Sequence, residues 1–290
     1  MPRTPRKPSA RKKSAKKAPA ILSATEILTS LPDVSSRAGM PAIDSITGIQ
    51  VMTTPAPSGA PTAAAAPAGA TYRIIKTNEI DAYEAAATAQ ETLGAPMAAM
   101  AAPTGDKFKG TARKAAKLSI ANADTEKFQD VRTLVNSLTP DVEMINHVPK
   151  IKTTSTSNRV KEEKRNIRVR AFIYAASRED DNDFHLIIGR NPTKTPEVYM
   201  TMELSGLPPN NSSSFAKLNA ARDAYKNFFA ADLPGLTYDF YDPPIPVTVE
   251  GSLFFDASHS SGSRPGPKSL KSRMPTVWEV HPITKITFPT

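Results

Sequence analysis

The sequence contains no cysteine among its 290 residues, which excludes disulfides, thiolate metal ligands and cysteine nucleophiles. Histidine and tryptophan are scarce, with four residues and one residue respectively. No apolar run approaches the roughly 18 residues that suggest a membrane-spanning helix, and the N-terminus lacks the apolar core of a secretory signal. These absences predict a soluble, cytoplasmic protein that has no membrane partner.

Acidic residues are absent from the first 20 positions, which carry eight basic side chains of a chain whose formal net charge is +9. We expect this tail (residues 1–20) to be disordered, and its Lys/Ala/Pro/Ser-rich composition resembles the tails of linker-histone-type proteins. Such flexible cations neutralise phosphate without reading bases, so DNA or RNA is a candidate partner. A solvated tail that only keeps the protein soluble is the alternative. The candidate contacts are Arg3, Arg6, Lys7, Arg11, Lys12, Lys13, Lys16 and Lys17.

Large apolar side chains are almost absent from residues 53–70, and residues 21–70 are predicted to be a low-complexity Ala/Pro-rich linker. A Ser-x-x-Glu capping box predicts one short helix in it, at 23–31. Residues 71–149 are predicted to be a helical and linker region, with helices over 79–93 and 124–138. Two short helices make too little core for a domain, so they are expected to pack on the C-terminal domain or dock a protein partner.

A second basic cluster lies between these two predicted helices and includes Lys107, Arg113 and Lys117. Phe108 stands within it, which leaves nucleic-acid binding open as a role for the cluster. A solvated, charged face is the alternative, and we favour it.

The pattern changes at residue 150, and residues 150–290 are predicted to form one mainly β domain. Five apolar segments have the length and alternation of strands, and an amphipathic helix separates the third from the fourth. This order matches a five-stranded OB-like barrel with one helix between strands 3 and 4, preceded by a largely disordered N-terminal region with short helices. The strands are predicted at 167–173, 184–188, 198–204, 247–255 and 277–288, and the helix at 213–229.

Three histidines of the predicted barrel stand in distinctive strings. These are an acidic turn leading to His185-Leu, a Gly-x-x-Phe-Phe-Asp-x-x-His segment ending at His259, and Glu-x-His281-Pro. The trio resembles an OB-like domain that recurs in bacterial proteins of uncharacterised function. That resemblance implies the fold and no particular reaction.

The same strings suggest a possible metal site. His185, His259, His281 and Asp256 are the candidate ligands, supported by the carboxylates Asp181, Asp183 and Glu279. Such sets bind zinc or a similar divalent metal with an open position for water, as metal-dependent hydrolases do. Alternatively, each histidine fixes a strand or a turn without a metal or cofactor, and we favour that structural interpretation.

A second possible nucleic-acid contact is the loop between strands 4 and 5, which is basic and free of acids. Its candidates are Arg264, Lys268, Lys271 and Arg273, although the acidic turn at 179–183 opposes a phosphate backbone at one end of the groove. The favoured prediction is therefore a non-enzymatic, nucleic-acid-binding module. A metal-dependent hydrolase and an assembly protein that docks a partner through residues 79–138 are the alternatives.

Overall fold

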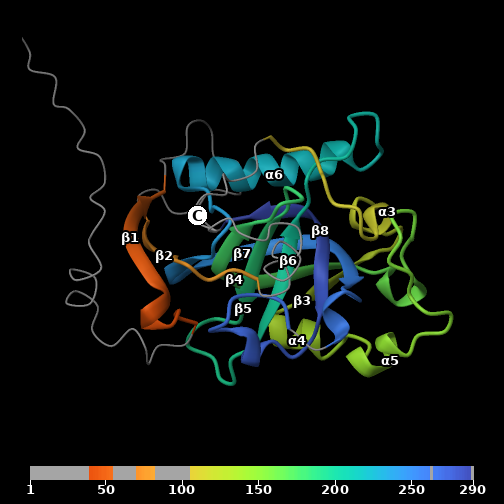
Figure 1. Cartoon of the computed structure of the whole chain (residues 1–290), viewed down its shortest axis with the longest axis horizontal. Helices are drawn as coiled ribbons and strands as arrows, with labels where there is room; N and C mark the ends of the chain where they lie inside the picture. Colours follow the sequence, from red (N-terminus) through yellow and green to blue (C-terminus); the bar gives the residue numbers. More distant parts are fainter. Residues whose placement is uncertain (1–38, 55–69, 82–104, 262–263, 289–290) are drawn as a thin grey trace, which may run out of the picture.

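The computed structural model describes residues 39–54, 70–81, 105–261 and 264–288 (Figure 1). The basic tail, the helix expected at 23–31 and most of the helix expected at 79–93 lie outside these residues. The described part of the chain is mainly β, and its eight strands belong to one mixed sheet.

The strands vary widely in length, from the four residues of β3 to the 17 of β7. They are β1 (Ile46–Thr53), β2 (Thr71–Thr77), β3 (Thr125–Phe128), β4 (Asn166–Arg178), β5 (Phe184–Gly189), β6 (Tyr199–Leu204), β7 (Asp239–Phe255) and β8 (Trp278–Thr287). The α-helices are α3 (Lys114–Lys117), α4 (Val131–Val135), α5 (Asp141–Ile145) and α6 (Phe215–Phe229). Single 3-10 turns cover Ile43–Ser45, Lys161–Glu163, Ala230–Asp232, His259–Ser261 and Lys271–Arg273.

Five of the strands pair in a circuit that returns to its starting strand. β4 pairs with β5, β5 with β6, β6 with β8, β8 with β7, and β7 again with β4. Only the β6–β8 pair in this circuit is parallel. β7 is long enough to pair with β2 as well, and β1 extends the sheet beyond β2 (Figure 1).

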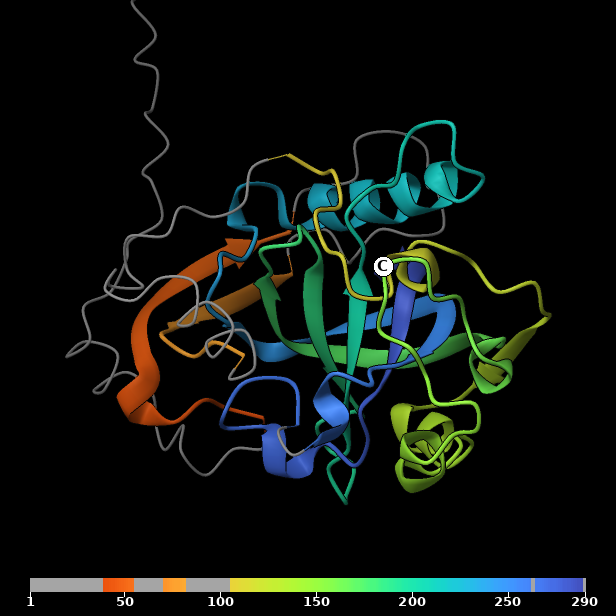
Figure 2. The ribbon, with the colours of Figure 1, turned by 45° about the vertical axis from the view of Figure 1, so that its right-hand side comes forward.

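The central strands β5 and β6 are buried along their whole length. On one face, their apolar side chains, such as Leu186 and Met202, join the main hydrophobic core together with Tyr225 of α6. That helix also brings Phe228 onto Phe288, with the ring planes nearly parallel and the centroids 3.8 Å apart. Figure 2 shows α6 lying along one side of the sheet. The opposite face of β5 and β6 carries the polar side chains considered below.

The prediction of five strands was wrong in number, because β1, β2 and β3 lie N-terminal to residue 150. β1 falls in the segment expected to be a linker, and β2 in the one expected to be helical. Apolar residues explain both strands: Ile49, Met52 and Ile74 are buried, and β2 hydrogen-bonds to β7. Few apolar residues suffice here because the long β7 offers an edge to pair with.

The helix expected over 124–138 is also different in the structure. Residues 125–128 form β3, which pairs in parallel with β4, and the helix α4 begins only at Val131. Asp130 accepts a hydrogen bond from the backbone N–H of Thr133 and starts α4 with a capping box. The apolar spacing was real, since Val131 and Leu134 are buried, but this cap divides the segment.

Within the described ranges, no helix combines the length and the apolar character that crossing a membrane requires.

Candidate metal centre

A cavity of about 180 Å³ lies beside the polar face of β5 and β6. Titratable side chains make up most of its lining: Asp81, Arg113, Lys117, Glu179, Asp181, His185, Glu203, Asp256 and His259. A larger pocket of about 780 Å³ lies beside the start of α6, but no carboxylate or histidine is among the described residues that line it. The groups capable of acid-base or metal chemistry therefore gather at the smaller cavity.

Strand alternation explains why these polar groups meet. His185 of β5 stands directly opposite Glu203 of β6 in the antiparallel register, so the two side chains share one face. Residues two apart on a strand also share a face, which adds Asp183 just before β5 and the pair Glu279 and His281 on β8. Three neighbouring strands thus direct carboxylates and imidazoles to the same side.

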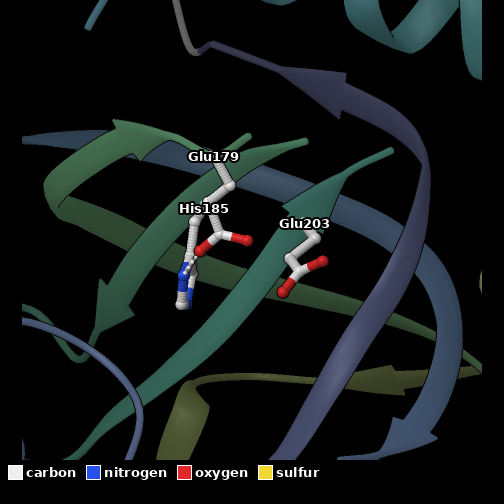
Figure 3. A group of neighbouring side chains, drawn as sticks. All are labelled: Glu179, His185 and Glu203. Atoms are coloured by element: carbon white, nitrogen blue, oxygen red, sulfur yellow. Dashed lines mark hydrogen bonds and ion pairs between the residues drawn. The ribbon is translucent and has the colours of Figure 1, made fainter. Parts of the chain in front are cut away.

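His185 is held by one of its ring nitrogens. Its Nδ1 contacts Glu179 Oε1 and lies 3.3 Å from the Tyr238 hydroxyl, while its Nε2 is buried without a hydrogen-bond partner in the described structure. Figure 3 shows one oxygen of Glu179 at the His185 ring and the other directed toward Glu203. Each of these three residues offers a ligand atom within 4.8 Å of the others.

A tight turn between β4 and β5 supplies two of the carboxylates. The Glu179 N–H donates to the Asp183 carbonyl, and Asn182 adopts the left-handed conformation with φ 74°, which asparagine tolerates better than most residues. Asp183 Oδ1 accepts the Gly206 N–H at 2.5 Å, and its Oδ2 is left facing the His281 ring. The acidic turn at 179–183 therefore positions Glu179 and Asp183.

His281 lies between three carboxylates and is fully buried. Its Nδ1 is 2.6 Å from Glu203 Oε2 and 3.7 Å from Glu279 Oε2, and its Nε2 is 3.4 Å from Asp183 Oδ2. Asp183, Glu203 and His281 form a second set of potential ligands within 4.8 Å. Glu203 belongs to both sets, so it stands at the centre of the cluster.

His259 is engaged in a separate group at the end of β7. Its Nδ1 contacts Asp256 and its Nε2 lies 3.6 Å from Asp81 Oδ1. Burial alone would lower the pKa of His259, but these two carboxylates raise it to about 11. Asp256 also accepts the Ser258 N–H at 2.8 Å and so closes the turn after β7. Asp256, His259 and Glu279 are a third set within 4.8 Å, although the charged imidazolium favours a structural role there.

The second basic cluster forms the expected solvated face only in part. Lys107 and Lys114 are exposed, whereas Arg113 and Lys117 point inward. Arg113 is buried in an ion pair with Glu163 at 2.7 Å. Lys117 Nζ lies 3.7 Å from Glu203 Oε2 and 3.8 Å from Asp181 Oδ2. Burial would lower the pKa of Lys117, but the surrounding carboxylates raise it well above its ordinary value.

Negative charge exceeds positive charge around the cavity. Leaving aside Arg113, whose charge is compensated by Glu163, seven carboxylates meet three imidazoles and one ammonium in or beside the cavity, so even fully protonated imidazoles leave an excess of three negative charges. The carboxylates are Asp81, Glu179, Asp181, Asp183, Glu203, Asp256 and Glu279. Burying such an excess is costly unless protons or cations compensate it.

The pKa values of the carboxylates are shifted in opposite directions. Burial raises the pKa of Glu179 to about 7, that of Glu279 to about 8, and that of Asp183 well above its usual range. For Glu203 burial acts in the same sense, but His281 and Lys117 outweigh it and hold the pKa well below the ordinary value. Protons therefore compensate part of the charge, and Glu203 stays ionised at the centre of the cluster.

The basic loop predicted to clamp phosphate is partly committed to other contacts. Arg264 pairs with Asp141 at 2.6 Å and Arg273 with Glu197 at 3.0 Å. Lys268 and Lys271 line a different pocket, of about 400 Å³. Two of the four loop candidates are thus already paired within the protein.

The cluster contains ligands that the sequence interpretation did not include. Glu203 and Lys117 were overlooked as site residues, and Glu179 was treated only as part of a turn. Glu203 had a signal, because it is the only charged residue in the otherwise apolar or neutral segment of β6. Lys117 had none, since only the packing of α3 turns it inward.

We compared the chain with profiles of protein families, with curated proteins and with solved structures, and none of the three gave a match. Function is therefore inferred from the chemistry of this site.

Proposed function

We propose that this protein is a metal-dependent hydrolase that holds a divalent cation between His185, Glu179 and Glu203. One observation carries the proposal: these residues converge at a buried cavity, and His185 Nε2 has no hydrogen-bond partner in the described structure. A buried imidazole nitrogen without a partner is costly, and a cation would provide that partner.

The fold proposed for this site is an OB-like barrel. The strands pair in the circuit β4–β5–β6–β8–β7–β4, and in chain order α6 lies between the third of these strands, β6, and the fourth, β7. Both features support this proposal. The additional strands β1, β2 and β3 would then be extensions at the edges of the barrel. The site lies on the face of β5 and β6 that is turned away from the main core.

The contacts at Nδ1 orient the His185 ring so that Nε2 can bind a cation. Metal-bound histidines commonly donate their other ring N–H to a carboxylate, which fixes the tautomer and the ring orientation. Glu179 Oε1 provides this contact at Nδ1, which leaves the other Glu179 oxygen, directed toward Glu203, as the ligand for the cation (Figure 3), and Tyr238 adds a second polar group. Without a cation, burial lowers the pKa of His185 but Glu179 raises it to about 9, so binding must release a proton.

The space beside the ligands favours catalysis over a purely structural cation. Structural zinc sites are closed by four protein ligands, whereas catalytic sites keep a position for water. A cavity of about 180 Å³ can hold water and a small part of a substrate. A bound divalent cation would make water acidic near pH 7, and a neighbouring carboxylate such as Asp181 would accept the proton.

Metal binding by the full chain tests the proposal. After removal of metals with a chelator and dialysis, the protein should bind Zn²⁺ or Mn²⁺, as measured by calorimetry and by elemental analysis. His185→Gln should weaken the binding at least tenfold, since it removes the unpartnered nitrogen. The matched control is His147→Gln, because His147 lies near the surface and pairs with Glu162. Equal affinity of both variants and wild type would contradict the proposal.

Nucleic-acid binding is a second candidate function, and it rests on the basic tail. Eight basic residues without an acid in residues 1–20 provide phosphate contacts that need no folded site. Binding of single- and double-stranded oligonucleotides should fall steeply with salt, and deletion of residues 1–20 should abolish it. Salt-independent binding, or binding unaffected by the deletion, would argue against this role for the tail.

A further inference from the structure

Building on the proposed hydrolase, we infer that the centre holds two divalent cations bridged by the Glu203 carboxylate and that its substrates are phosphate esters. The first cation would lie at Glu179, His185 and Glu203, and the second at Asp183, Glu203 and His281. Nothing in the one-cation proposal requires the second site.

The two sets of ligands have the geometry of a shared carboxylate. Each set brings its ligand atoms within 4.8 Å of one another, and Glu203 is the member common to both. A carboxylate has two oxygens, so it can bind one cation with each. In two-metal hydrolases the ions lie roughly 3.5–4 Å apart, a separation that a single carboxylate can bridge.

The second set of ligands, Asp183, Glu203 and His281, also contains buried polar atoms that lack hydrogen-bond partners. Asp183 and His281 are each about 0% exposed, and Asp183 Oδ2 and His281 Nε2 face one another at 3.4 Å. Neither atom has a hydrogen-bond partner in the described structure. A cation between these two buried polar atoms would satisfy both of them.

The fixed carboxylate orientation supports the second position as well. Asp183 Oδ1 is already used by the Gly206 N–H, so only Oδ2 is available to a ligand. The β8 backbone is likewise anchored, because Arg159 donates to the His281 carbonyl at 2.6 Å. Both ligands are therefore held in place before a cation arrives, which lowers the cost of binding.

Two cations compensate more of the negative charge around the cavity than one cation does. The carboxylates around the cavity exceed the available positive groups by three charges even when every imidazole is protonated. A single divalent ion that displaced imidazole protons would leave the site anionic. Two divalent ions bound to neutral His185 and His281 supply four positive charges and, with the Lys117 ammonium and the His259 imidazolium already counted, reduce the excess to one negative charge.

The size of the cavity and the pair of cations point to phosphate esters. A phosphoryl group is small enough for a cavity of about 180 Å³, and paired cations stabilise both its attacking and its leaving oxygen. In the reaction, an oxygen of water bonds to phosphorus and the bond from phosphorus to the ester oxygen breaks. The water proton passes to a carboxylate, and the departing alkoxide or phenoxide takes up a proton, so no other reagent is consumed.

Metal stoichiometry tests the two-cation centre. Titration of the metal-free full chain with Mn²⁺, followed by calorimetry and electron paramagnetic resonance, should give two ions per chain and a spin-coupled signal. His185→Gln and His281→Gln should each reduce this to one uncoupled ion, while Glu203→Gln should weaken both. The number of ions bound by the wild-type chain tests the proposal even if a variant fails to fold, and circular dichroism identifies such a variant.

The outcomes separate the two proposals. Absence of any bound Mn²⁺ or Zn²⁺ would overturn the proposed function itself. One ion per chain, lost equally in His185→Gln and His281→Gln, would overturn only the two-cation centre.

Substrate class is tested with chromogenic esters and an anion. The Mn²⁺-loaded chain should hydrolyse p-nitrophenyl phosphate or bis(p-nitrophenyl) phosphate at least 100-fold faster than the chelated chain, and inorganic phosphate should inhibit competitively. p-Nitrophenyl acetate serves as the control, and acetate replaces phosphate as the control anion. Hydrolysis of the acetate ester alone, or no inhibition by phosphate at millimolar concentration, would overturn the assignment of phosphate esters.

Discussion

Glu163 links the 3-10 turn before β4 to the end of β7 beside the cavity. Its replacement by glutamine tests how much this buried ion pair contributes to stability. Its Oε1 accepts from Arg113 at 2.7 Å and from the Phe255 N–H at 2.9 Å. Its Oε2 accepts from Arg113 and from the Val160 N–H, each at 2.7 Å. In each of these four hydrogen bonds, an oxygen of the carboxylate accepts from an N–H donor.

Glu163→Gln keeps the volume and removes the charge. Whichever way the amide is turned, its NH₂ group meets two donors, and the buried Arg113 guanidinium loses its counter-ion. Removing one partner from a buried pair typically costs about 3–5 kcal/mol of unfolding free energy. Since domains of this kind have about 5–15 kcal/mol in total, the variant should still fold. Arg113 immediately precedes α3, so the change should also loosen the placement of Lys117.

Urea unfolding followed by circular dichroism measures the loss, and the chain provides a matched control. Arg165 and Glu126 form the same two-pronged ion pair, at 2.7 and 2.6 Å, but their side chains are 24% and 43% exposed. Glu126→Gln should therefore cost only about 0–1 kcal/mol. If both glutamine variants shift the midpoint by the same amount, burial is not what makes the Arg113 pair important, and the reasoning fails.

Three further predictions concern stability. Burial raises the pKa of Asp239 to about 6 in spite of Lys76, so the folded state holds this proton more tightly than the unfolded chain does. The resulting stabilisation of the fold is complete below about pH 4 and is lost as the pH rises through 6. Asp239→Asn should gain about 1–3 kcal/mol over wild type at pH 8 but not at pH 4, by urea unfolding at both values; equal effects would contradict the shift. Asp130→Ala should lose about 1 kcal/mol through the missing cap of α4 and about 0–1 kcal/mol through the lost ion pair with Arg190, with Asp124→Ala as control. Leu186→Ala should cost about 2–5 kcal/mol by calorimetry while the metal stoichiometry stays unchanged.

Much of the C-terminal fold could be predicted from the sequence because its signals are local. The strand at 184–188 and the helix ending at Phe229 were placed within about one or two residues of β5 and α6. Apolar alternation and Gly/Pro boundaries carry this information without tertiary context. β1 and β3 could not be found in this way, because each depends on an edge supplied by a strand far away in sequence.

The candidate site was harder to predict because its members are brought together by register. The histidines were recognised, but nothing local shows that His185 stands opposite Glu203. A shift of one residue between β5 and β6 would turn these side chains to opposite faces. The inward turn of Lys117 depends on packing alone and gives no pattern in the sequence.

The two faces of β5 and β6 have different roles, one in the hydrophobic core and the other at the cavity. Because neighbouring residues alternate, Leu186 and Met202 join the main core on one face while His185 and Glu203 line the cavity on the other. The apolar face is packed against α6, and the stability gained there offsets the cost of the charge excess buried on the polar face. Replacements on the first face should therefore change the unfolding free energy, whereas replacements on the second should change proton and cation binding. A site built between buried strands is also rigid, which keeps its ligands in place for a cation.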